Sequence, residues 1–287
     1  MIKTATQLKA LIRNKANKNS GKAQLLIRNY AMERFLERVS VSEYKDNFIV
    51  KGGILVTSMV GLDNRATMDI DTTIVDFSLD EKTISKIIED ISGIELGDNI
   101  TFDVKSIESI MDEAEYNGFR FIMNAYLDKT RIPMKIDVST GDVITPKAIQ
   151  NSYPLMFEER SITLWAYNLE TVLAEKLETI ISRGTANSRM RDYYDVWVLQ
   201  NTFDEIDSET LRTAFTATCL KRNSPALENP YEDVLAKLEE SQIMKEQWDN
   251  YRVKNSYSAD LNWNDALSSV KTLMDRIHVN DSPGLIE

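Results

Sequence analysis

The stretch "RATMDIDTTIV", residues 65–75, decides how this sequence is interpreted. Its apolar residues alternate with threonines and aspartates, which is the pattern of a β-strand with one buried face. Side chains two residues apart point the same way in a strand, so Asp69 and Asp71 share a face. Carboxylates this close raise one pKa or recruit a cation, and Mg²⁺ prefers such oxygen ligands. The stretch therefore predicts part of a metal site for phosphoryl transfer, and the structural alternative is an edge strand with a solvated face.

Two other segments favour the metal site. The run "MKIDVST", residues 134–140, repeats the alternation, and a neighbouring strand could bring Asp137 beside the aspartate pair. The apolar run "NFIVKGGILVTSMV", residues 47–60, is interrupted by Gly52-Gly53, which indicates a tight turn. Backbone amides at such a turn could contact a phosphate. Together the segments predict three carboxylates, two metal positions and a phosphate-binding turn.

Composition limits the class of protein. The chain has 287 residues, 43% of them hydrophobic, which suffices for one large domain or two lobes with cores of their own. A single cysteine, Cys219, excludes an internal disulfide and fits a reducing cytoplasm. With only one histidine, His278, a zinc site and a Cys-His or Ser-His triad are excluded as well. We find no leader and no apolar run long enough for a membrane span, so we expect a soluble cytoplasmic protein.

Charge is distributed unevenly along the chain. The net charge is −11, but residues 1–51 carry 11 Lys/Arg against 4 Asp/Glu. The negative net charge argues against a general nucleic-acid binder. The excess of basic residues in the N-terminal segment allows that segment to attract an anion. If that segment follows an RNA backbone, we expect Arg28, Arg34 and Arg38 to contact it. The alternative is a pair of ordinary solvated helix faces.

Periodicity predicts an α+β protein with two lobes. A mixed α/β lobe over residues 1–155, with basic N-terminal helices, precedes a mostly helical lobe over residues 156–287. We expect helices over 4–17, 21–39, 82–92, 169–183, 192–200, 207–219, 230–252 and 264–277, and strands over 68–75, 100–107, 119–127 and 134–140. Asn168 and Gly184 are the expected caps of the helix over 169–183.

Lys176 is an anomaly in that helix. It falls inside the apolar stripe, and Arg183, seven residues further on, lies on the same side. One interpretation is a lysine that extends outward from the edge of the stripe. The other is a lysine at the seam between the lobes that reaches a triphosphate.

The segment "SRMRDYYDVWVL", residues 188–199, also allows two interpretations. Asp192 could cap the next helix while Asp195 pairs locally with Arg191. Alternatively, Asp192 orients Lys176 or a substrate hydroxyl.

Four ordered motifs resemble one known family. The segments "KGGILVTSMVGLDNRATMDIDTTI", "MKIDV", "LAEKLETIISRG" and "RDYYDVW" are similar to those of AbiEii/AbiGii-type toxins, nucleotidyltransferase-like proteins of bacterial toxin–antitoxin and phage abortive-infection systems. The resemblance covers roughly residues 25–200. It implies a DNA-polymerase-β-like nucleotidyltransferase lobe.

The resemblance also implies roles for individual residues. Gly52 and Gly53 match the motif that holds the triphosphate, although many nucleotidyltransferases have Gly-Ser there. Asp69 and Asp71 match the metal ligands, and Asp137 matches the third carboxylate, which would help to activate the acceptor hydroxyl. Lys176 and Asp192 match the lysine and the aspartate of the family's later motifs, which are needed for toxicity in relatives. We expect Lys176, together with Arg183, to contribute to nucleotide binding.

The activity that follows from the resemblance is metal-dependent nucleotidyl transfer. The resemblance implies Mg²⁺ or Mn²⁺ as cofactor, an NTP as donor with GTP a candidate, and the 3′ end of tRNA as acceptor. It also implies an antitoxin encoded alongside, without a stable protein complex. Two alternatives stay open: a non-catalytic nucleotide-binding toxin that sequesters a partner, and nucleotidyl transfer to a protein or a small molecule.

Overall fold

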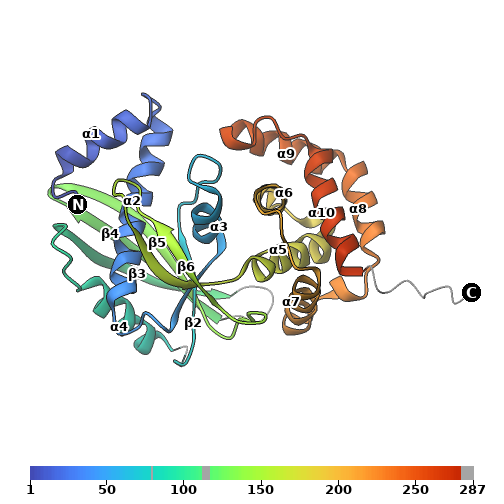
Figure 1. Ribbon diagram of the computed structural model, residues 1–287, viewed down its shortest axis with the longest axis horizontal. Coiled ribbons are helices and arrows are strands. Elements are labelled where there is room, and N and C mark those ends of the chain that lie inside the picture. The colour runs from blue at the N-terminus through green and yellow to red at the C-terminus, as the bar shows by residue number, and fades with distance from the viewer. Residues whose placement is uncertain (79, 112–116, 279–287) are drawn as a thin grey trace, which may run out of the picture. The chain divides into compact units, whose positions relative to one another are not determined.

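The computed structural model describes residues 1–78, 80–111 and 117–278, and its contacts divide the chain into two compact units. The first unit comprises residues 1–59, 66–142 and 148–166, and the second comprises residues 60–65, 143–147 and 167–287. The first is a mixed α/β unit and the second is helical (Figure 1). The predicted α+β class is confirmed.

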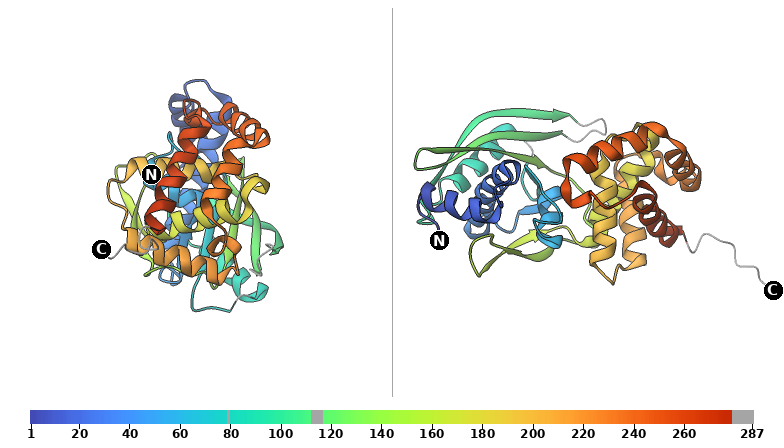
Figure 2. Two further views of the ribbon diagram at one scale, coloured as in Figure 1. Left: turned by 90° about the vertical axis from the view of Figure 1, so that its right-hand side faces the viewer. Right: turned by 90° about the horizontal axis from the view of Figure 1, so that it is seen from above.

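A seven-stranded mixed sheet organises the first unit, with strand order β3-β4-β5-β2-β1-β7-β6. Its strands are β1 (Phe48–Lys51), β2 (Ile70–Ile74), β3 (Ile100–Met111), β4 (Asn117–Leu127), β5 (Thr130–Ser139), β6 (Ile149–Pro154) and β7 (Ser161–Ala166). β2 pairs parallel with β5 and β1 pairs parallel with β7, while the other neighbours are antiparallel. Figure 2 shows the long strands β3 and β4 side by side as one hairpin.

α2 and α4 cover one face of this sheet. The α-helices of the first unit are α1 (Ala5–Lys15), α2 (Ser20–Val41), α3 (Gly52–Val60), which follows β1 directly, and α4 (Glu81–Ser92). α2 packs on β5 and β7, and α4 packs on α2 and β3. The stripe Ile84, Ile87, Ile88 and Ile91 gives α4 its buried side, and Asp80 begins the helix by accepting a hydrogen bond from the Thr83 amide at 2.9 Å.

Alternation along the central strands separates their two faces. Met134, Ile136 and Val138 of β5 are all buried, and α2 packs on this strand. The residues between them point to the opposite face, which is where the predicted carboxylate Asp137 lies. The sheet therefore carries its apolar residues on one face and its charged candidates on the other.

The second unit is built from six α-helices within its described residues. They are α5 (Leu169–Arg183), α6 (Met190–Thr202), α7 (Ser208–Lys221), α8 (Tyr231–Glu240), α9 (Gln242–Lys254) and α10 (Trp263–His278), with 3₁₀ turns at Gly184–Ala186, Pro225–Leu227 and Ser256–Ser258. Fully buried Trp248 packs against Trp263 with the two rings tilted, and Trp263 packs against Tyr193, so large aromatic rings fill the core. None of the described helices has the length and apolar character needed to cross a membrane.

One predicted element was wrong, and one hairpin was missed. The expected helix over 230–252 is interrupted at Ser241, which ends α8 and caps α9 by accepting a hydrogen bond from the Met244 amide at 3.4 Å. The hairpin of β6 and β7 was missed because most of the β6 side chains are exposed and give no apolar alternation. The helix over 169–183 has the predicted bounds, with Asn168 and Gly184 at the predicted cap positions, although the Asn168 side chain makes no cap hydrogen bond and donates to the Thr145 carbonyl at 2.8 Å.

Candidate active site

A row of charged side chains crosses four strands of the first unit. Asp71 of β2 lies directly opposite Lys51 of β1 and directly opposite Asp137 of β5, and Asp137 lies opposite Arg120 of β4. Directly opposite residues of paired strands project from the same face. The register therefore produces the sequence Lys51, Asp71, Asp137, Arg120 across the sheet, with two adjacent carboxylates between two cations. We call these four residues the charged row.

Asp69 lies two residues before Asp71, next to the charged row. β2 begins at Ile70, so Asp69 precedes the strand, and its carboxylate accepts a hydrogen bond from the Thr67 hydroxyl at 2.9 Å. Burial and the charges of Asp69 and Asp137 raise the pKa of Asp71 to about 6, while Lys51 and the Gly53 amide act in the opposite direction. The three carboxylates are thus close enough to interact, as expected for a site that takes a cation.

Gly52 and Gly53 allow Asp71 to approach the start of α3. Gly52 has a φ of +62°, and a Cβ there would lie 2.7 Å from Cβ and Cγ of Asp71. Any other residue at position 52 would be strained and would displace the carboxylate. The Gly53 amide donates to Asp71 Oδ2 at 3.2 Å. The Gly-Gly turn therefore joins the strand carboxylate to a helix N-terminus, where backbone amides attract anions.

Asp137 is held by a residue that the sequence analysis missed. Arg120 Nε donates to Asp137 Oδ1 at 2.8 Å, and Arg120 Nη2 donates to Oδ2 at 2.6 Å. Among the described residues, no three histidine, cysteine, aspartate or glutamate side chains are grouped so as to hold a metal ion. Asp69 and Asp71 have the carboxylate chemistry that a hard divalent ion requires, and Asp137 is turned onto Arg120.

Lys51 is the second cation that sequence reasoning missed. Its ammonium donates to Asp142 Oδ2 at 2.6 Å and to the Ser139 hydroxyl at 2.8 Å. Burial raises the pKa of Asp142, but the charge and hydrogen bond of Lys51 outweigh it and leave the pKa lower than usual. Lys51 is therefore a fixed positive charge at one end of the charged row.

The second unit holds Lys176 in a cluster of ion pairs. Lys176 Nζ lies 2.6 Å from Asp195 Oδ2 and 3.1 Å from Asp192 Oδ1, and its side chain is 12% exposed. Burial alone would lower the pKa of Lys176, but Asp195 and Asp192 raise it. The lysine is therefore charged and held in place, and the contact of Lys176 with Asp192 agrees with the interpretation in which Asp192 orients it.

The structure overturns the local interpretation of Asp192 and Asp195. Asp192 lies in the first turn of α6 and does not cap it, because the N-cap position is Arg189. Asp195 pairs with Arg65, whose Nε lies 2.6 Å from Asp195 Oδ1, and not locally with Arg191. Asp192 and Asp195 are three residues apart on one helix, so both can point toward one lysine. That spacing was the signal in the sequence from which the contact of Asp195 with Lys176 could have been predicted.

Arg183 lies apart from this cluster along the helix. It is the exposed last residue of α5, about 10 Å along the helix axis from Lys176. Its part in nucleotide binding stays a prediction.

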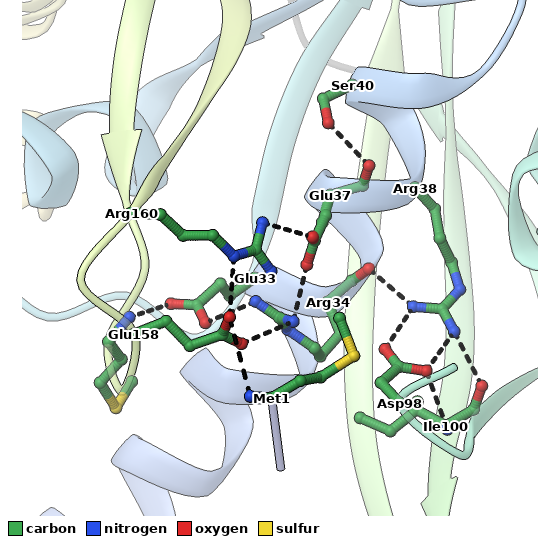
Figure 3. Close-up of polar contacts among 11 residues, drawn as sticks. Met1, Glu33, Arg34, Glu37, Arg38, Ser40, Asp98, Ile100, Glu158 and Arg160 are labelled. Atoms are coloured by element: carbon green, nitrogen blue, oxygen red, sulfur yellow. Dashed lines mark hydrogen bonds and ion pairs between the residues drawn. The ribbon is translucent and has the colours of Figure 1, made fainter. Parts of the chain in front are cut away.

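The prediction that three arginines of the second N-terminal helix contact an RNA backbone is wrong for two of them. Arg34 and Arg38 of α2 are buried, with 0% and 1% of their side chains exposed. Figure 3 shows their partners: Arg34 pairs with Glu33, Glu37 and Glu158, and Arg38 makes two hydrogen bonds to Asp98 at 2.8 and 2.9 Å. Only Arg28 is partly exposed, and it contacts Met68 Sδ at 3.5 Å. These buried arginines belong to the core.

The aspartates of β2 and β5, the Gly-Gly turn and the helix of Lys176 belong to the segments on which the resemblance to AbiEii-type toxins rests. The family model of the nucleotidyl transferase AbiEii toxin, of type IV toxin–antitoxin systems, matches residues 34–272. The chain belongs to this AbiEii toxin family, which confirms the resemblance and implies an antitoxin as partner.

More distant comparisons concern solved structures. The chain is similar to JHP933 from Helicobacter pylori, at 12% identity with a TM-score of 0.43, over 89% of this chain and 91% of that one. It is also similar to an antigenic nucleotidyltransferase-like protein from Paracoccidioides brasiliensis, at 14% identity with a TM-score of 0.36, over 93% of this chain and 94% of that one. No curated protein matches it.

Proposed function

We propose that this toxin transfers a nucleotide from an NTP, with GTP the first candidate, to an acceptor hydroxyl at the 3′ end of tRNA in the cytoplasm. The observation that carries the proposal is the charged row, in which register brings Asp71 beside Asp137 and the Gly-Gly turn joins Asp71 to the start of α3. The host process would be phage defence, and the antitoxin would act without a stable complex. Family membership supports the toxin and transferase parts of this proposal.

In the proposed mechanism the residues of the first unit bind the reacting groups. Asp69 and Asp71 would hold Mg²⁺ or Mn²⁺, which supplies charge stabilisation for the α-phosphate and the departing pyrophosphate. The amides at Gly52-Gly53 would receive the phosphates. Asp137, once free of Arg120, would accept the proton of the acceptor hydroxyl.

In the second unit, we assign to Lys176 the role of neutralising negative charge on the phosphates. Its ammonium is kept protonated by Asp192 and Asp195 and has limited freedom to move. A fixed cation of this kind stabilises charge that develops on a leaving group without reorganising. Asp192 and Asp195 are then positioning residues for Lys176, and Arg65 holds Asp195 in place.

The test uses purified protein with each of the four α-labelled NTPs, total RNA and Mg²⁺. We expect label on tRNA and release of pyrophosphate, both lost in Asp71→Asn. The matched control is Asp103→Asn, which removes a half-exposed carboxylate from β3 of the same sheet and leaves the charged row intact. Bound nucleotide without labelled product would establish the sequestering toxin instead, and label on a protein or small molecule would replace tRNA as the acceptor.

A further inference from the structure

Arg120 is the cation at the β4 end of the charged row, next to Asp137. Both oxygens of Asp137 accept hydrogen bonds from its guanidinium, at 2.6 and 2.8 Å. The charge of Asp69 also acts on Arg120, in addition to that of Asp137. Since arginine does not lose its proton in proteins, this positive charge leaves the carboxylates only if the side chain moves.

A second partner for Arg120 lies on its other side. Glu108 of β3 is directly opposite Arg120, just as Asp137 is directly opposite it on β5. Glu108 is exposed, so its carboxylate is available without any change in the sheet. Arg120 thus stands between two carboxylates on the same face and can exchange one for the other by rotation about its side-chain bonds.

The pair of Arg120 and Asp137 is exchangeable, unlike the buried pairs of the same unit. The side chains of Arg120 and Asp137 are 35% and 19% exposed, whereas those of Arg38 and Asp98 are both 1% exposed. A partly solvated ion pair is weak because water and salt compete with it. A divalent ion beside Asp69 and Asp71 carries twice the charge of the guanidinium and is the stronger competitor for Asp137.

We propose that Arg120 is the resident counter-cation of the carboxylate site, and that a divalent metal displaces it from Asp137 toward Glu108. This inference rests on the proposed metal-dependent function, since it concerns the same three aspartates. Arg120 then determines when Asp137 becomes available to metal or to the acceptor. Its presence weakens metal binding, and Glu108 moderates that competition by accepting the displaced guanidinium.

The primary test is Mn²⁺ binding to the purified full chain, measured by the loss of the free-ion electron paramagnetic resonance signal. We expect Arg120→Met to bind Mn²⁺ about tenfold more tightly than the parent, because no guanidinium then competes for Asp137; tenfold corresponds to about 1.4 kcal/mol. The matched control is Arg131→Met, because Arg131 is an exposed residue of β5 six positions from Asp137, on the same face and about 20 Å away. We expect this control to stay within about twofold of the parent, since screening removes a surface charge at that distance.

Glu108→Gln supplies a second measurement that a simple charge effect does not reproduce. We expect the single variant Glu108→Gln to bind Mn²⁺ about threefold more weakly than the parent, because the displaced Arg120 can then no longer pair with a carboxylate at position 108. A surface ion pair of this kind is worth under about 1 kcal/mol. In the Arg120→Met background we expect Glu108→Gln to have almost no effect. The double-mutant cycle therefore isolates the exchange from the general loss of one negative charge.

Three results contradict all or part of the inference, and they are distinguishable. If Asp71→Asn abolishes Mn²⁺ binding while Arg120→Met binds no more tightly than the parent, Arg120 is not a competitor and the metal-dependent function stands. If neither the parent nor Arg120→Met binds Mn²⁺, the metal-dependent function and the inference both fail. Equal effects of Glu108→Gln in the two backgrounds would contradict the exchange toward Glu108.

Discussion

Two groups of charged residues on opposite faces of one sheet differ in how completely they are balanced. Around α2, the guanidiniums of Arg34, Arg38 and Arg160 meet the carboxylates of Glu33, Glu37, Glu158 and Asp98 (Figure 3). The Met1 ammonium lies 4.0 Å from Glu158 Oε2, so four cations face four carboxylates when Glu33, whose pKa burial raises to about 7, is ionised. This network is closed.

The charged row with its neighbours Asp69 and Asp142 is unbalanced. Its cations are Lys51 and Arg120, and its carboxylates are Asp69, Asp71, Asp137 and Asp142. An excess of two negative charges at a partly exposed position matches the charge of one divalent ion. The comparison teaches that a closed buried network destabilises the fold when one partner is removed, whereas an excess of like charge indicates a ligand.

The largest effect is expected from breaking the closed network at Arg38→Met. This change leaves Asp98 buried without its guanidinium, and we expect a loss of about 3–5 kcal/mol in the free energy of unfolding. Urea denaturation followed by circular dichroism measures it. The double variant Arg38→Met/Asp98→Asn should recover much of the loss, because no uncompensated charge is then left. A loss below about 1 kcal/mol for the single variant would show that burial of this pair is not essential.

The pH dependence of stability is the next largest effect and concerns Glu33. Burial raises the pKa of Glu33 from 4.5 to about 7, so the folded chain binds this proton more tightly than the unfolded chain does. The contribution of Glu33 to stability therefore falls as pH rises from about 4.5 to 7, and stays constant above. A shift of this size corresponds to on the order of 3 kcal/mol.

Glu33→Gln removes this dependence. Its free energy of unfolding, relative to the parent, should rise between pH 5 and pH 8, measured by urea titration at each pH. A relative free energy that stays flat over this range would mean that Glu33 remains ionised in the folded chain.

A smaller effect is expected at Lys176, in the cluster of the second unit. Lys176→Met keeps the apolar stem but leaves Asp192 paired with Arg189 and Asp195 paired with Arg65, without the ammonium that joins them. We expect a loss of about 2 kcal/mol in stability, in the range for a lost charged hydrogen bond. We also expect weaker nucleotide binding by calorimetry. Lys176→Met/Asp192→Asn should recover stability without recovering nucleotide affinity, and recovery of both would make Lys176 purely structural.

Sequence periodicity predicted the elements better than it predicted their contacts. The bounds of α5 and the alternation of β2 and β5 follow from local patterns, which short-range sterics and burial impose. The burial of Arg34 and Arg38 does not, because their carboxylate partners at Glu158 and Asp98 are far away in the sequence. A helix with three arginines looks the same in sequence whether they face solvent or a buried acid.

Arg120 is an intermediate case. Strands β4 and β5 are joined by the two-residue turn Asp128-Lys129, which pairs Leu127 with Thr130. Counting back from that turn places Arg120 opposite Asp137. The signal was therefore present, but it required the turn and its register in addition to the apolar alternation.

The smallest expected effect is the most direct test of the comparison between closed and open networks. Arg120→Met removes a guanidinium with two hydrogen bonds to a carboxylate, as Arg38→Met does, but from a pair whose arginine is 35% exposed. Water can solvate Asp137 after the change, so we expect the free energy of unfolding to change by less than about 1 kcal/mol. Arg131→Met, on the same face of β5, is the reference for loss of one surface charge. If Arg120→Met instead destabilised the chain as much as Arg38→Met, the pair of Arg120 and Asp137 would be part of the structural core, and the surplus of carboxylates would have to be balanced without moving Arg120.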